Sequence, residues 1–113
     1  MNRDRAALSE ILERMERAIE FAGPDRHRFM ESALQQEAVI RQLEVVGEAA
    51  KRVSAPTRNR SVEVPWRGMA GFKDFAIHPY DSIDLERVWA IVQNELPGIR
   101  AKVRAVFSTL ARD

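Results

Sequence analysis

An unbroken apolar stripe in the middle of the chain constrains its fold more than any other feature. Between residues 29 and 53, apolar side chains recur at alternating steps of four and three, at Val39, Leu43, Val46, Ala50 and Val53. This spacing places them on one face of an α-helix. Gly47 lies beside the stripe and, having no side chain, would let another helix approach closely. We therefore expect a long helix over about residues 29–53 that packs against other helices.

The segments before and after this stripe show the same helical spacing. A first helix is expected over residues 3–21, followed by a turn over 22–25 where glycine and proline stop it. After the long helix, a proline and several polar residues predict a loop over 54–63. Pro65 is well placed at a helix start, so a short third helix is expected over 66–77.

The last third of the chain predicts a fourth helix with an extension. Ser82 or Asp84 can cap this helix, and its apolar face runs as far as Leu96. Pro97 and Gly98 are expected to kink or break the chain at that point. Apolar residues then continue at helical spacing towards the C-terminus, so the extension should be helical as well.

The helical pattern is nearly uniform, because only three residues at 62–64 alternate with a period of two. The sequence therefore predicts an all-α fold, an up-and-down bundle of four to five helices in a single domain over residues 1–113. Several of the helices are long for so small a core. Their second apolar edges could serve a homodimer, because two-fold pairs are the commonest oligomers.

Composition narrows the classes of function. The chain has no cysteine and only two histidines, so it offers no metal-ligand spacing, and we expect neither a metal nor a cofactor. No stretch approaches the roughly 18 apolar residues of a membrane span, and the N-terminus lacks a signal-peptide pattern, so a cytoplasmic protein is expected. The net charge is +1, so any nucleic-acid site must rest on local basic patches.

The segment K-D-F-A-I-H-P-Y at residues 73–80 carries residue types that can act on a phosphodiester. Pro79 disfavours the α conformation at His78, so the predicted helix should end there. A helix C-terminus favours the protonated imidazole and suits a residue that both donates and accepts a proton. On these residues alone, the commoner role for His78 would be to cap the carbonyls at the end of the helix.

This segment resembles the R-x4-H-x-Y motif of the HEPN superfamily, and of its HepT-like toxin branch in particular. The flanks are similar as well: I-R-Q-L-E-V-V-G-E-A-A-K at residues 40–51, P-W-R and M-A-G-F within 65–72, and V-W with Q-N-E-L-P within 88–97. The resemblance covers about the whole chain. It departs in one respect, because Lys73 stands in place of the motif arginine and Asp74 follows it, where the family often has asparagine.

The resemblance implies a function for the motif residues. His78 would be the catalytic acid and base of a metal-independent ribonuclease, the toxin of a toxin–antitoxin pair. Lys73, in place of the arginine, would hold negative charge on the phosphate. Tyr80 would accept AMP from a partner nucleotidyltransferase that acts as antitoxin. The implied partners are therefore an RNA substrate, that nucleotidyltransferase and a second copy of the chain.

The spacing within the motif leaves alternatives open. On an α-helix, Asp74 could reach His78 four residues on and orient its imidazole, and an exposed carboxylate is the equal alternative. Lys73 lies five residues before His78, so these two converge only where the helix end unwinds or a second subunit contributes. An ammonium also lacks the bidentate fork of a guanidinium. A second hypothesis is therefore a non-catalytic partner of a nucleotidyltransferase or nucleotide, and a third is a helical interaction module without a site.

A basic cluster lies beside the motif in the sequence. Arg58, Arg60 and Arg67, together with Lys51, could follow an RNA backbone, and a solvated loop is the alternative explanation.

Other conspicuous residues are expected to be structural. Glu48 should pair with Arg52 one helical turn later. Trp66 and Trp89 should belong to the core. His27 is expected in a turn without a partner.

Overall fold

The structure is a computed structural model that describes residues 2–76 and 83–110, with the backbone alone at residues 73, 75 and 76. Within these two ranges every regular element is a helix and no strand occurs, so the predicted all-α class is confirmed. The helices are α1 (Arg3–Ala22), α2 (Arg26–Glu31), α3 (Ala33–Arg52), α4 (Ala55–Arg60), α5 (Trp66–Ala70), the 3-10 helix η1 (Gly71–Ala76), α6 (Leu85–Ala90), the π-helix η2 (Ile91–Glu95) and α7 (Leu96–Thr109).

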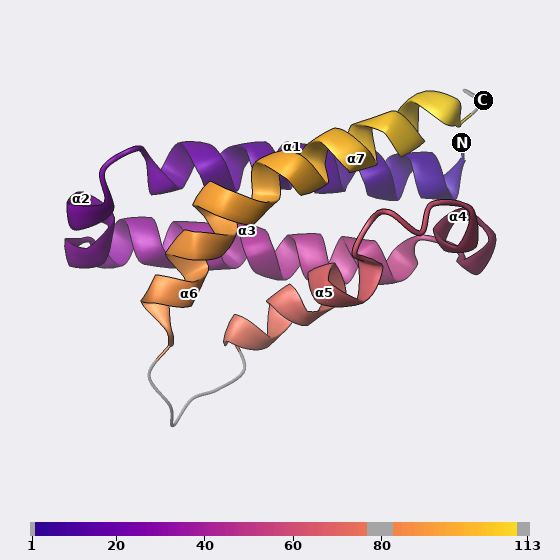
Figure 1. Cartoon of the computed structure of the whole chain (residues 1–113). Coiled ribbons are helices and arrows are strands. Elements are labelled where there is room, and N and C mark those ends of the chain that lie inside the picture. Colours follow the sequence, from indigo (N-terminus) through magenta and orange to yellow (C-terminus); the bar gives the residue numbers. More distant parts are fainter. Residues whose placement is uncertain (1, 77–82, 111–113) are drawn as a thin grey trace.

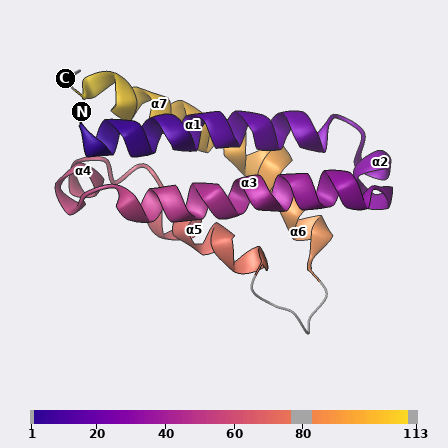
Figure 2. The same ribbon diagram turned by 180° about the vertical axis from the view of Figure 1, so that it is seen from behind.

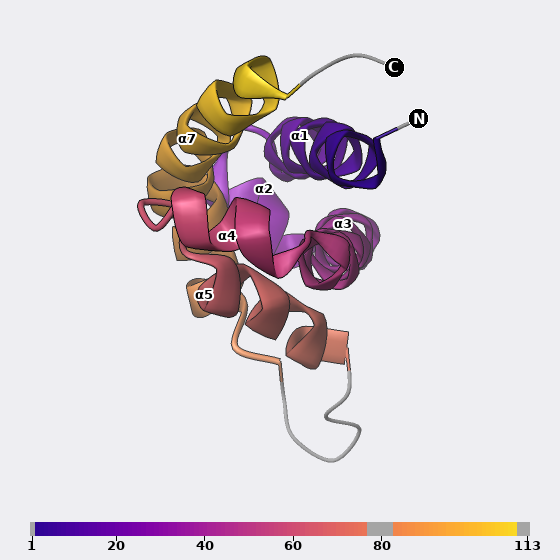
Figure 3. The same ribbon diagram turned by 90° about the vertical axis from the view of Figure 1, so that its right-hand side faces the viewer.

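Helices α1 and α3 form an antiparallel pair that makes up the body of the molecule (Figure 1; Figure 2). α7 packs along α1, while α5 and η1 pack along α3. Viewed from one end, α4 lies across the end of the bundle, between α7 and α3 (Figure 3). The buried core includes three stripe residues of α3 that were predicted to share one face, and three apolar residues of α1: Val39, Leu43 and Val46, with Leu8, Ile11 and Met15. None of the described helices is long and apolar enough to span a membrane.

Local sequence signals explain the bounds of α1. The Asn2 side chain accepts a hydrogen bond from the backbone N–H of Arg5 at 3.1 Å, which caps the first turn. The helix ends at Gly23, whose φ of 68° lies in the left-handed region and whose N–H donates to the carbonyl of Ile19. The first helix and its stop are therefore confirmed.

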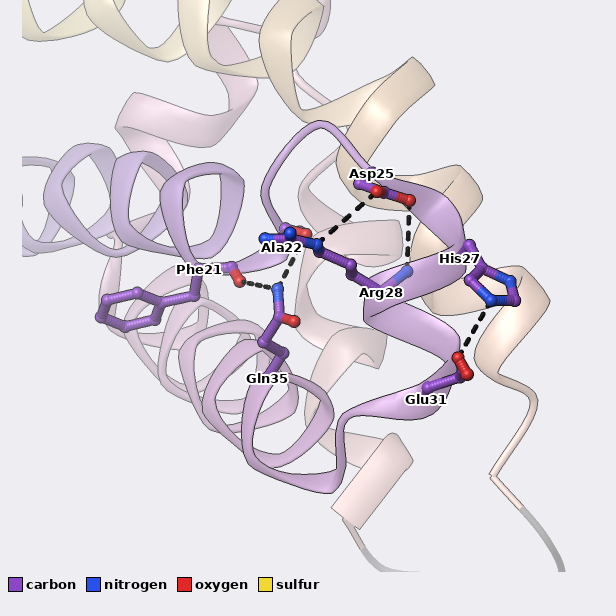
Figure 4. Close-up of polar contacts among 7 residues, drawn as sticks. All are labelled: Phe21, Ala22, Asp25, His27, Arg28, Glu31 and Gln35. Atoms are coloured by element: carbon purple, nitrogen blue, oxygen red, sulfur yellow. Dashed lines mark hydrogen bonds and ion pairs between the residues drawn. The ribbon is translucent and has the colours of Figure 1, made fainter.

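The second predicted helix proves to be two. Ser32 is extended and breaks the chain between α2 and α3, and its hydroxyl caps α3 by accepting from the N–H of Gln35 at 3.1 Å. The Gln35 amide also donates to the carbonyls of Phe21 and Ala22 at the end of α1 (Figure 4). This side chain satisfies orphan helix-end carbonyls and fixes the α1–α3 hairpin.

The polar loop expected over residues 54–63 contains a helix, α4, so that prediction was wrong over residues 55–60. Pro56 lies in the first turn of α4, where it needs no N–H partner, and so it starts a helix as well as stopping one. The carboxylate of Asp4 accepts from the N–H of Ser54 at 2.8 Å, from its hydroxyl at 2.5 Å, and from the hydroxyl of Thr57. These contacts attach the start of α4 to α1.

The third helix begins after Pro65 as predicted, but it does not stay α-helical. It changes from α5 to the 3-10 helix η1 at Gly71. Met69 and Phe72 are buried, and both helices contact α3. Trp66 is only half-buried, and its indole N–H donates to the carbonyl of Ser61 at 3.0 Å.

The chain from α6 through η2 to α7 runs as one continuous helical rod, so of the kink or break expected at Pro97 and Gly98, the break does not occur. The rod widens to a π-helix at η2, where the N–H of Leu96 donates to the carbonyl of Ile91, five residues earlier. Pro97 then lies in the first turn of α7, where its missing N–H and its ring cause no loss. Asp84 caps α6 as predicted, by accepting from the N–H of Arg87 at 3.0 Å.

Candidate functional site

The predicted motif begins on η1 and continues beyond the described residues. Lys73 and Asp74 lie on this 3-10 helix, and the Asp74 side chain is exposed. His78 and Tyr80 lie outside the described residues. The chain leaves η1 at Ala76 and is described again from Ile83, which lies two residues before α6.

The 3-10 geometry of η1 changes the spacing argument within the motif. Residues three apart share a face of a 3-10 helix, whereas the pairing of Asp74 with His78 assumed α-helical steps of four. That α-helical premise was wrong for the segment up to Ala76. Lys73 and His78 were expected to converge only if the helix end unwinds or a second subunit contributes; a 3-10 helix is wound more tightly than an α-helix and His78 lies outside the described residues, so this expectation stays a prediction.

The basic cluster beside the motif divides into two sites. Three of its members, Lys51, Arg58 and Arg67, line a groove of about 660 Å³ formed by α3, α4 and α5. We call this the basic groove, and we define it by these cations together with three neighbours on its wall: Asn59, Val62 and Trp66.

The fourth member of the cluster, Arg60, lines a separate cavity of about 570 Å³ between α4 and α7. Glu63 lines that cavity too, so Arg60 faces a surface of mixed charge. Arg60 also lies close enough to Asp4 to act on its carboxylate electrostatically.

The electrostatics of the basic groove differ from those of the rest of the surface. Among the residues that the structure describes, no carboxylate lines it. Elsewhere, several exposed arginines pair with acids; for example, Arg17 pairs with Glu13 at 2.6 Å, and Arg52 pairs with Glu10 at 3.1 Å. Across residues 2–76 and 83–110, the guanidinium group of Arg58 has no hydrogen-bond or ion-pair partner, and the same holds for Arg67. These two groups therefore retain their capacity to bind an anion.

Two groove residues were missed by the sequence analysis. Asn59 lies on α4 and Val62 in the turn that follows it, both within the segment that was expected to be a polar loop, and no local signal there pointed to a groove. Trp66 was expected in the core, but it is half-buried and also lines the groove. Trp89 is half-buried against the core, with its ring centroid 5.3 Å from that of Phe29.

Two expectations about ion pairs outside the groove were wrong. Arg52 pairs with Glu10 on α1, and not with Glu48, which is exposed on α3. His27, expected in a turn without a partner, lies on α2 and pairs with the carboxylate of Glu31 at 3.0 Å (Figure 4). Both of these side chains are largely exposed, so their pairing contributes little to stability.

The described residues contain no group of three or more histidine, cysteine or acidic residues that could hold a metal ion. The candidate site consists of the groove and the motif segment. The two are connected, because α5 lines the groove and continues directly into η1, which bears Lys73 and Asp74.

Comparison with known proteins identifies the family. The profile of the HepT-like ribonuclease family, described as "Ribonuclease HepT-like", matches residues 11–106, a span that contains the groove and the motif. The chain therefore belongs to the HepT-like ribonuclease family, as its motifs predicted.

Curated relatives agree with this assignment. A Methanocaldococcus jannaschii protein, named as a candidate RNase, is 43% identical over 94 residues, which cover 82% of this chain and 78% of the relative. A Thermococcus cleftensis protein named "Probable ribonuclease HepT" is 34% identical, over 88% of this chain and 86% of its own. A candidate RNase of Caldanaerobacter subterraneus is 30% identical over 94% of this chain and 96% of its own. No solved structure matches the chain significantly.

Proposed function

We propose that this protein is the toxin of a toxin–antitoxin pair and that it cleaves RNA through His78 without a metal ion. The observation that carries the proposal is the family match over residues 11–106, which includes the motif at 73–80. RNA supplies its own nucleophile, because the 2′-hydroxyl lies next to the scissile phosphate. The protein has to move protons and to stabilise charge on the phosphoryl oxygens.

In the proposed reaction, neutral His78 accepts the proton of the 2′-hydroxyl. The 2′-oxygen then attacks phosphorus, and the bond from phosphorus to the 5′-oxygen breaks. The leaving 5′-oxygen takes up the proton held by His78, so the products are a 2′,3′-cyclic phosphate and a 5′-hydroxyl. Lys73 stabilises the negative charge that accumulates on the phosphoryl oxygens, and Asp74 assists by orienting the imidazole.

The identity of residue 73 favours one alternative. An ammonium forms a point contact with phosphate, whereas the guanidinium of the family motif forms two parallel hydrogen bonds. Lys73 therefore supports a second candidate function, in which the protein has little nuclease activity and acts as the binding partner of a nucleotidyltransferase or nucleotide.

RNA cleavage by the purified, partner-free protein in excess chelator tests the proposal and separates the two candidates. The parent should cleave, and Lys73→Arg should cleave faster by about tenfold, which is the rate equivalent of ~1.4 kcal/mol. A parent that is inactive while Lys73→Arg cleaves would establish the second candidate. If both proteins are inactive in the absence of any partner, the ribonuclease proposal is wrong.

A further inference from the structure

The proposed cleavage chemistry assigns no role to the residues of the basic groove. Its cations come from three different helices: Lys51 from α3, Arg58 from α4 and Arg67 from α5. The chain has nearly as many acidic as basic residues, 17 against 18, yet none of the acidic residues in the described part of the chain lines this groove. A concentration of cations in a nearly neutral protein is the pattern of a local anion site.

We propose that the basic groove binds a single-stranded segment of the RNA substrate, with Arg58, Arg67 and Lys51 in contact with successive phosphates. This inference rests on the proposed ribonuclease function and assigns its substrate a binding site outside the motif. Arg58 and Arg67 carry the argument, because neither has a partner within the described parts of the chain. No ion pair has to break when they bind a phosphate.

The connection from α5 to η1 links the groove to the motif. Arg67 lies on α5, and Lys73 lies six residues later on the same helical run. The rise of an α-helix followed by a 3-10 helix separates the two positions by about 10 Å along the axis. A stacked strand advances roughly 3.4 Å per nucleotide. RNA held at Arg67 would therefore reach the motif within about three nucleotides.

The wall of the groove favours unpaired bases over a duplex. Trp66 presents a half-buried indole whose N–H is already bonded to the carbonyl of Ser61, so the ring is held in place. Val62 is 81% exposed, which is unusual for a large apolar side chain. Asn59 adds an amide that can donate and accept hydrogen bonds. Rings and apolar side chains contact base faces, which a duplex hides and a single strand exposes.

Binding measurements with the His78→Ala variant test the proposal. This variant is expected not to cleave the RNA probe, so the probe should stay intact during the measurement. The probe is a fluorescently labelled single-stranded RNA of about 12 nucleotides, and its affinity is measured as a function of salt concentration. Arg58→Gln and Arg67→Gln should each lower the slope of log K against log salt by about 0.7, the value for one phosphate contact on a single strand. Both residues are exposed, so both variants should fold.

Arg104→Gln is the matched control for loss of charge. Arg104 is exposed on α7, away from the groove, and its substitution removes the same charge from the protein. It should leave the salt slope unchanged. If Arg104→Gln lowers the slope as much as Arg58→Gln does, the binding is a diffuse effect of net charge and the groove is not the site.

Val62→Glu tests the groove without removing a cation. A carboxylate at that position should repel the phosphates of the RNA strand and weaken binding about tenfold. Ala101→Glu is its control, since Ala101 is exposed on α7 and does not line the groove. Equal loss of affinity in these two variants would overturn the proposal. So would a duplex RNA of the same length that binds more tightly than the single strand and has the same dependence on Arg58 and Arg67.

The outcomes separate this inference from the proposed function. If the parent cleaves RNA and the groove variants cleave it with unchanged KM and salt dependence, the ribonuclease stands and the groove proposal falls. If the parent does not cleave RNA but the groove variants lose binding as expected, the groove stands and the cleavage proposal falls.

Discussion

We propose that Tyr80 is the residue that regulates the protein, as the acceptor of AMP from a partner nucleotidyltransferase. It follows His78 by two positions, with Pro79 between them. In the proposed modification, the phenolic oxygen attacks the α-phosphate of ATP and pyrophosphate leaves, so that AMP is attached through a phosphodiester. The added negative charge and the bulky base would lie beside the catalytic histidine. Like charge would then repel an incoming RNA backbone, and Lys73 would be occupied by the new phosphate.

Intact-mass spectrometry checks this proposal on protein co-expressed with its cognate nucleotidyltransferase. The parent should gain the mass of AMP, and Tyr80→Phe should not, because it lacks the acceptor oxygen. An adduct that persists in Tyr80→Phe would assign the modification to another residue. A parent that is silenced by the partner without any adduct would show that the partner acts by covering the site.

The basic cluster shows what single-residue prediction from sequence can and cannot do. The sequence placed Arg58, Arg60, Arg67 and Lys51 in one cluster, but it could not show that Arg60 lines a different cavity from the other three. Arg58 and Arg60 are two positions apart, and on a helix such residues point in different directions. Because α4 was expected to be a loop, nothing in the sequence separated the residue that faces the groove from the one that faces α7.

At the scale of elements, α4 is held by a carboxylate that lies far away in the sequence. Burial alone would raise the pKa of Asp4, but hydrogen bonds from Ser54 and Thr57 and the nearby charge of Arg60 outweigh it, so its pKa falls below the ordinary value of 3.8. The hydroxyl of Ser54, which could cap α4 itself, donates to Asp4 instead. The start of α4, and with it one wall of the basic groove, therefore depends on α1.

Asp4→Ala should lower the free energy of unfolding by about 1–2 kcal/mol near neutral pH, a usual cost of losing a helix-cap carboxylate. Because folding lowers the pKa of Asp4, its contribution is complete above 3.8 and is lost as the pH falls through the lower pKa of the folded state. Urea unfolding of the parent and the variant should therefore give a difference that shrinks below pH 4.

Glu37→Ala is the matched control, since it removes an exposed carboxylate from α3 and should cost less than ~0.5 kcal/mol. The explanation given for Asp4 is contradicted if the difference in free energy of unfolding between the parent and Asp4→Ala stays constant as the pH is lowered below 4.

The elements that the sequence predicted well are those with strong local signals. The apolar periods of α1 and α3, the stop at Gly23 and the cap at Asp84 are all written in neighbouring residues. The failures depend on contacts that are remote in sequence or on unusual backbone geometry. The stop expected before Pro56 is confirmed, because α3 ends at Arg52, but the helix α4 that starts there and is held by Asp4 was missed. At Pro97 the chain stays helical, and the π-helix η2 accommodates the proline. The break at Ser32 lacked a proline or a glycine to mark it.

At the scale of the whole molecule, the motif-bearing segment lies at the periphery of the bundle. η1 packs mainly on α3 (Figure 1), and Asp74 on η1 is exposed. The large apolar side chains of Phe21, Leu34 and Ile83 are also exposed to solvent. A second copy that packs near this segment would cover apolar surface and could complete the site, as the predicted homodimer requires.

Light scattering at micromolar concentration should therefore give about twice the chain mass of 12.9 kDa, and dilution should lower both the mass and any cleavage rate per chain together. A monomer at every concentration would eliminate the composite site. Activity that survives dilution to monomer would locate the complete site within one chain.

The rate of RNA cleavage by the partner-free parent and by His78→Ala, in excess chelator and at equal concentration, tests the central claim most directly. The account predicts that the parent cleaves and leaves 2′,3′-cyclic phosphate ends, and that His78→Ala loses at least about a hundredfold in rate, as expected when a general acid and base is removed. Equal thermal stability of the two proteins would show that the loss is chemical and not a failure to fold. Cleavage by His78→Ala at the parent's rate would contradict the account, because the catalytic proton transfer would then belong to another residue.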